Sequence, residues 1–99
     1  MSRSLLERRL TELTDELGAR RSELRIAEEQ LAQLAEEADD ARLRSLVSET
    51  PLAEREYREA KKHADAMGRH RDDVAAAILR IERSQDDLLD KLIEESKRP

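Results

Sequence analysis

The sequence predicts an all-α protein: a two-helix antiparallel coiled-coil hairpin that dimerises into a four-helix bundle. Its composition is that of long helices, because 43% of the residues are charged, 1% are aromatic, and glycine and proline number two each. Apolar residues also recur in alternating steps of four and three along two segments. Between those segments the pair Thr50-Pro51 predicts a corner.

Charge, cysteine content and hydropathy exclude several classes of protein. The net charge is −5 and the bases are mixed with acids, which disfavours nucleic-acid binding. The absence of cysteine excludes disulfides, cysteine-based zinc sites and thiol catalysis. No apolar run approaches the ~20 residues of a membrane span, and the start, "MSRSLLERRL", lacks the apolar stretch of a signal peptide. We therefore expect one cytoplasmic domain, residues 1–99, with no cofactor and no membrane contact.

The first predicted helix covers about residues 5–47. Ser4 and Glu7 have the spacing of a capping box, which places the helix start near Leu5. From there to residue 41, ten of eleven core positions are apolar, and Arg20 is the exception. Disorder is the competing interpretation of such a charged composition, but disordered chains do not sustain this period.

The second predicted helix covers about residues 51–96 and follows a corner at 48–50. Thr50 is the expected N-cap and Pro51 the first helical residue, where a missing N–H costs no helical hydrogen bond. Ten of twelve core positions are apolar, and Arg71 and Gln85 are the exceptions. Because the connection is short, the two helices should be antiparallel neighbours.

A single register brings the two core rows together, with facing residue numbers that add to 98. Leu17 then faces Ile81, the long Arg71 faces Ala27, and no two polar core residues meet. Charge agrees, because the acidic run 28–40 lies opposite the more basic run 58–70. On this basis we predict three ion pairs between the helices: Arg42 with Glu54, Arg44 with Glu56, and Glu37 with His63.

Few residues suggest chemistry. The inward Arg20, Arg71 and Gln85 suggest either a ligand site, such as a nucleotide-sensing one, or polar residues that set the register and extend to water. His63 and His70 are seven residues apart, whereas metal ligands on a helix lie three or four apart, so we predict no metal site. Without a phosphate loop or a pocket around paired carboxylates, we expect no enzymatic activity and no catalytic residues.

One flank of the hairpin suggests a partner. Large aliphatic residues of the second helix lie there beside small residues of the first, and both glycines fall on this side at a cost of ~1 kcal/mol each. The predicted partner-binding flank consists of Thr11, Thr14, Gly18, Ala75, Leu79, Leu89 and Ile93. It predicts a non-enzymatic protein-interaction module that forms a homodimer or docks on a partner protein.

The stretch "LAEREYREAKKH", residues 52–63, contains Glu56-Tyr57 followed by Ala60-Lys61, just after a short turn. It resembles the second-helix start in the N-terminal hairpin of Gre-type transcript-cleavage factors. That resemblance implies an alternative function, a bacterial transcription regulator that inserts its hairpin tip into the secondary channel of RNA polymerase. The tip residues would be Glu49, Glu54, Glu56 and Tyr57. The chain has Thr50 and Ala53 where the family has an Asp and a Glu, and residues 1–99 include no counterpart of the family's C-terminal domain, so the resemblance implies channel binding without cleavage.

Overall fold

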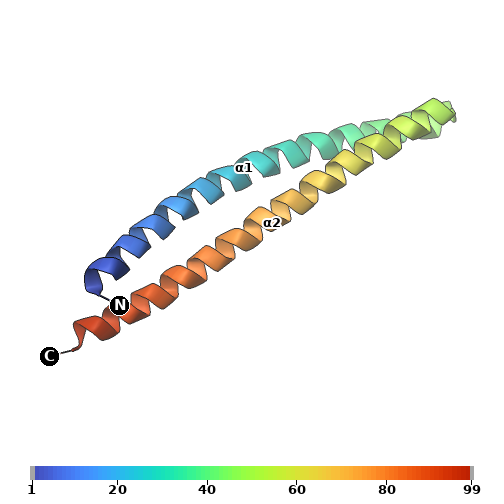
Figure 1. The fold of residues 1–99 in the computed structure, drawn as a ribbon. Coiled ribbons are helices and arrows are strands. Elements are labelled where there is room, and N and C mark those ends of the chain that lie inside the picture. Colours follow the sequence, from blue (N-terminus) through green and yellow to red (C-terminus); the bar gives the residue numbers. More distant parts are fainter. Residues whose placement is uncertain (1, 99) are drawn as a thin grey trace. The chain divides into compact units, whose positions relative to one another are not determined.

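The chain folds into two long helices. The computed structural model describes residues 2–98, with α1 at Arg3–Ser48 and α2 at Pro51–Ser96. The helices pack against each other as a hairpin, with α1 coloured from blue to green and α2 from yellow-green to red in Figure 1. Residues 2–98 contain no strand, which confirms the all-α prediction. Within residues 2–98, neither α1 nor α2 contains an apolar stretch of the length that a membrane span requires.

Helix α1 begins earlier than the capping-box pattern predicted. The Leu5 N–H donates a hydrogen bond to Ser2 Oγ at 3.2 Å, so Ser2 and not Ser4 is the N-cap. The side chain of Glu7, the other member of the predicted box, pairs with Arg3 at 3.1 Å. The capping-box prediction was therefore wrong. Ser2 and Ser4 can both serve as the N-cap, and capping by Ser2 lengthens the helix by two residues.

The corner consists of Glu49 and Thr50. Glu49 has a φ of 51°, in the left-handed region, and its N–H still donates to the Ser45 carbonyl at 3.1 Å. The Ala53 N–H donates to Thr50 Oγ1 at 3.2 Å, which confirms Thr50 as the N-cap of α2. A non-glycine residue therefore ends α1 in a conformation that costs free energy.

The hairpin divides into two units. The terminal unit contains residues 2–23 and 74–98, and the tip unit contains residues 24–73. In the terminal unit, Gln85 Nε2 donates to Thr14 Oγ1 at 3.4 Å, and Arg21 Nη2 lies 3.8 Å from Glu82 Oε2. Numbers rise along α1 while they fall along α2, so the two segments are antiparallel and fit the expected register. In the tip unit, a Cβ placed on Gly68 would lie 3.9 Å from Leu31 Cδ1, which fits the same register.

The core is a narrow seam along the facing sides of the helices. Among residues 2–98, every buried residue lies at a predicted core position; these are Leu6, Leu13, Leu17, Ala27, Ala41, Ala53, Val74, Ile78, Ile81 and Leu88. The other predicted core positions, including those of Arg20, Arg71 and Gln85, are half-buried, and none is exposed. Such a seam leaves both flanks and the outer sides of the helices in water, where a partner can reach them.

Candidate functional site: protein-interaction surfaces

The predicted partner-binding flank lies entirely in the terminal unit, and we call it the apolar flank. Helix α2 supplies its large side chains, which are 56% exposed at Leu79, 47% at Leu89 and 53% at Ile93. Helix α1 supplies the exposed small residues Thr11, Thr14 and Gly18, and Ala75 of α2 is half-buried. About half of each large side chain therefore remains for a partner to cover.

The two threonine hydroxyls of the apolar flank are already hydrogen-bonded inside the hairpin. Thr11 Oγ1 donates to the Glu7 carbonyl at 3.1 Å, and Thr14 Oγ1 donates to the Leu10 carbonyl at 2.9 Å. Thr14 Oγ1 also accepts the bond from Gln85 described above. Because a buried polar group is costly chiefly when it loses its partners, covering these threonines carries a reduced penalty.

An ion pair interrupts the apolar flank. Arg21 and Glu82 link α1 to α2 at 3.8 Å, and their side chains are 62% and 44% exposed. In the chain, Glu82 falls between Leu79 and Leu89, so the apolar surface has two parts separated by a neutralised pair. A partner on this flank would therefore contact three kinds of surface: large apolar side chains, an ion pair without net charge, and small side chains.

The hairpin itself does not require a glycine at either position. A Cβ added to Gly18 would have no neighbour within 4 Å, and one added to Gly68 would make an ordinary contact with Leu31. Alanine at either site should therefore stabilise its helix by ~1 kcal/mol. A close neighbour on the outside of the hairpin is one physical reason to retain glycine there.

The tip exposes apolar side chains that the sequence analysis did not predict as part of a binding surface. Val47 is 86% exposed, and three further aliphatic residues near the corner are also exposed; together the four form the apolar tip: Leu43, Leu46, Val47 and Leu52. The available signal was the concentration of aliphatic residues away from core positions in "LRSLVSETPL". Of the predicted tip residues, Glu49, Glu54 and Glu56 are exposed, whereas Tyr57 is half-buried in the seam.

The two departures from the Gre pattern have structural roles in this chain. Thr50 caps α2 through its hydroxyl, and Ala53 is buried at 8% exposure in the seam. A carboxylate at position 53 would have to be buried there or displace its neighbours. The acidity of this tip consequently comes from Glu49, Glu54 and Glu56.

The inward arginines direct their charged ends to acids of their own helices. Arg20 Nη1 lies 3.1 Å from Glu23 Oε2, and Arg71 Nη1 lies 3.2 Å from Asp72 Oδ1. Gln85 is occupied by its bond to Thr14. These contacts support the interpretation that the polar core residues set the register and extend to the seam's edge.

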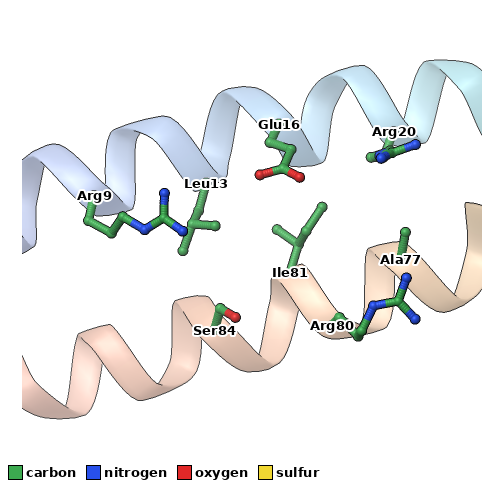
Figure 2. A pocket seen from close by; sticks show the side chains of 8 residues that line it. All are labelled: Arg9, Leu13, Glu16, Arg20, Ala77, Arg80, Ile81 and Ser84. Carbon is green, nitrogen blue, oxygen red and sulfur yellow. The ribbon is translucent and has the colours of Figure 1, made fainter.

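A hollow of about 230 Å³ lies along the opposite side of the terminal unit from the apolar flank. Figure 2 shows its lining, in which Glu16 extends from α1 toward Ile81 of α2 and Arg9 lies next to Leu13. Arg9 already pairs with Glu12 at 3.1 Å. Arg20 of the lining likewise pairs with Glu23, and the Glu16 carboxylate offsets the charge of Arg80, so this shallow groove offers little net attraction to an anionic ligand.

Two further predictions concern charged side chains. Within residues 2–98 none of the three predicted interhelical ion pairs forms at 4 Å, and Arg42 lies 3.9 Å from Asp39 of its own helix. Those predictions were wrong. For Arg42 the reason is that Asp39, three residues away on the same helix, is reached with less loss of side-chain freedom. In the same part of the chain, no three His, Cys, Asp or Glu residues are grouped closely enough to hold a metal ion.

Comparison with known proteins identifies no relative from which a function could be proposed. No family model, curated protein or solved structure matches the chain. Two surfaces carry the argument: the apolar flank of the terminal unit and the exposed tip of the tip unit.

Proposed function

We propose that the protein is a non-enzymatic interaction module that self-associates through the apolar flank into a four-helix dimer. The observation that carries this proposal is the half-exposed row of Leu79, Leu89 and Ile93 beside small residues. A two-fold contact suits such a surface, because each copy supplies both a ridge of large side chains and a groove of small ones. The internally bonded threonine hydroxyls reduce the cost of closing that contact.

The available apolar surface sets the strength of the dimer. Full burial of a Leu or Ile side chain is worth ~1.5–3 kcal/mol, and these residues keep about half of that for a partner. Three residues from each of two copies therefore contribute ~5–9 kcal/mol before the costs of association. Because a micromolar dimer needs about 8 kcal/mol net, the apolar flank alone supports only weak association and other contacts should add to it.

Light scattering and sedimentation of the purified chain test this proposal. We expect the wild type to change from monomer to dimer as its concentration rises toward hundreds of micromolar. Leu79→Glu combined with Leu89→Lys should remain monomeric and helical. The matched control, Ala77→Lys with Ser84→Glu, introduces the same charges on the opposite side of α2 and should dimerise normally. A wild type that stays monomeric at all concentrations would exclude self-association. If the control variant lost dimerisation as completely as the flank variant, the apolar flank would be excluded as the dimer contact.

A second candidate function is favoured by the tip. The apolar tip and the exposed Glu49, Glu54 and Glu56 form a mixed surface that suits docking into a cavity of another protein. The resemblance to Gre-type hairpins makes bacterial RNA polymerase the partner to test. Under this proposal, Glu49→Lys with Glu54→Lys should abolish copurification with the polymerase while helicity is retained. Absence of the polymerase from wild-type preparations, or its retention by the variant, would end this proposal.

A further inference from the structure

The outermost row of each helix carries charged side chains that form no ion pair with other residues in the range 2–98. This row is the heptad position farthest from the seam, and it recurs every seventh residue. A level here means one position along the hairpin, at which one residue of α1 lies beside one residue of α2. At four levels both outer rows carry a charge, on eight exposed residues: Arg8, Asp15, Glu29 and Glu36 on α1, and Lys62, Arg69, Arg83 and Asp90 on α2. Within residues 2–98, none of the eight takes part in an ion pair within 4 Å. Most other charged residues in this range form no ion pair either, so the feature that distinguishes these eight is how their signs match between the two rows.

The two rows are complementary at every level where both are charged. In the register of the hairpin, residues at one level have numbers that add to 98. The pairs in the terminal unit are Arg8 with Asp90 and Asp15 with Arg83. The pairs in the tip unit are Glu29 with Arg69 and Glu36 with Lys62. All four pairs have opposite signs, and both units show the pattern independently.

A hairpin cannot use this complementarity by itself, because the outer rows of its two helices point away from the seam and from each other. A second copy can use it. When the two-fold axis runs parallel to the helices, α1 of one copy lies on α2 of the other with every level preserved. The outer rows then border the new contact, as the flanking positions of a coiled coil border its seam, and each complementary pair forms twice.

We propose that the dimer has this same-end arrangement, with α1 on the partner's α2 and both tips at one end. The reversed arrangement places α1 on α1 of the second copy. In that antiparallel contact, a register that brings Arg8 of one copy to Glu36 of the other also brings Asp15 to Glu29. The second of these contacts is between like charges. Electrostatic complementarity of this kind chiefly selects orientation and suppresses wrong pairings. The same arrangement also places the large residues of the apolar flank, on α2, over the small residues on α1 of the partner.

This inference rests on the proposed self-association and is tested by exchanging charges without changing composition. One variant exchanges the two α1 charges of the terminal unit, as Arg8→Asp with Asp15→Arg. A second exchanges their counterparts, as Arg83→Asp with Asp90→Arg. A third carries all four substitutions. The control, Arg9→Glu with Glu12→Arg, exchanges an α1 pair that already forms within one helix.

Dimer dissociation constants by sedimentation equilibrium separate the outcomes. Each two-residue exchange creates four like-charge contacts in the same-end dimer, so we expect affinity to fall by roughly tenfold or more at low salt. The four-residue variant should return to within about threefold of wild type, and the control should not change. Added salt should reduce the differences. Thermal unfolding at monomeric concentrations should be alike in all variants, because none of the eight outer-row charges forms an ion pair among residues 2–98 of the hairpin.

Failure of this inference and failure of the proposed function give different results. A wild type that never dimerises removes the self-association on which both depend. A dimer whose affinity is insensitive to the exchanges, or is not restored in the four-residue variant, overturns the same-end arrangement alone. Species that grow beyond the dimer with concentration also overturn it, because they indicate open-ended pairing of outer rows.

A distance measurement tests the arrangement directly. The chain has no cysteine, so a spin label on Ser48→Cys reports only the tip. Two helices side by side span ~20–24 Å, so labels at the same end should lie within about 30 Å of each other. A distance distribution of the dimer centred well beyond that value would overturn the proposal.

Discussion

Leu88 and Leu89 are neighbours in α2 with opposite environments. Leu88 is buried in the seam at 8% exposure, whereas Leu89 lies on the apolar flank at 47% exposure. Substitution by alanine removes the same three carbons from the same stretch of helix in both cases. The pair therefore separates the contribution of the seam from that of the flank with little difference in helix propensity.

The expected losses follow from the covered fractions. Three carbons are worth ~2.4 kcal/mol when fully buried, at ~0.8 kcal/mol each. Subtracting the exposures from 100 leaves 92% of Leu88 and 53% of Leu89 covered, which scales the losses to ~2.2 and ~1.3 kcal/mol. Leu88→Ala also leaves a cavity, so its total should be ~2–4 kcal/mol. Leu89→Ala opens to water and leaves none, so its loss in the monomer should remain near ~1 kcal/mol.

Urea unfolding followed by circular dichroism, at low and at high protein concentration, measures both losses. The loss for Leu88→Ala should be similar at the two concentrations, because the seam belongs to one hairpin. Under the proposed self-association, the loss for Leu89→Ala should grow with concentration, because a dimer would stabilise the wild type by mass action. Equal losses at low concentration would refute the assignment of Leu88 to the seam. A concentration-independent loss for Leu89→Ala would refute its place in the dimer contact.

Three further predictions concern the corner and the register. Glu49→Gly should raise the free energy of unfolding by ~0.5–1 kcal/mol, because it removes the left-handed strain at φ 51°, and an unchanged urea midpoint would contradict that strain. Thr50→Ala should lower it by ~1 kcal/mol through loss of the cap on the Ala53 N–H; a neutral effect would show that water replaces the hydroxyl. In the terminal unit, Leu17→Cys with Ile81→Cys should oxidise to a disulfide within one chain, seen as a mobility shift on a non-reducing gel. Leu17→Cys with Leu88→Cys, one heptad away, should not, and equal linking of both pairs would exclude the register.

The seam was predictable because it depends on a period repeated along the whole chain. Each apolar residue at a core position adds the same signal, so single exceptions such as Arg20 and Gln85 do not alter the pattern. In the part of the chain that the structure describes, all ten buried residues lie on that pattern. The cap at Thr50 was also predictable, because a Thr-Pro pair between two periodic segments has few other structural meanings.

Features that depend on a choice between near-equal local alternatives were not predictable. Ser2 and Ser4 are both good N-caps, and the structure uses the one that gives the longer helix. Arg42 was predicted to pair with Glu54 of the other helix, but it pairs with Asp39 of its own. The left-handed conformation of Glu49 has no sequence signal, because glycine is the usual residue there. These outcomes differ by about a kcal/mol, which is less than sequence patterns resolve.

The features that the hairpin does not need are concentrated away from its seam. Gly18 weakens its helix, Glu49 is strained, and Leu79 and Val47 expose apolar surface, and the packing of the two helices accounts for none of these features. Residues that do not favour the stability of a fold are expected at positions where function imposes a different requirement. It follows that substitutions which optimise the hairpin, such as Gly18→Ala, should raise the stability of the monomer and weaken its association with a second copy. Opposite signs of these two effects are what an interaction module predicts, whereas a chain with no partner on this flank would show the first effect without the second.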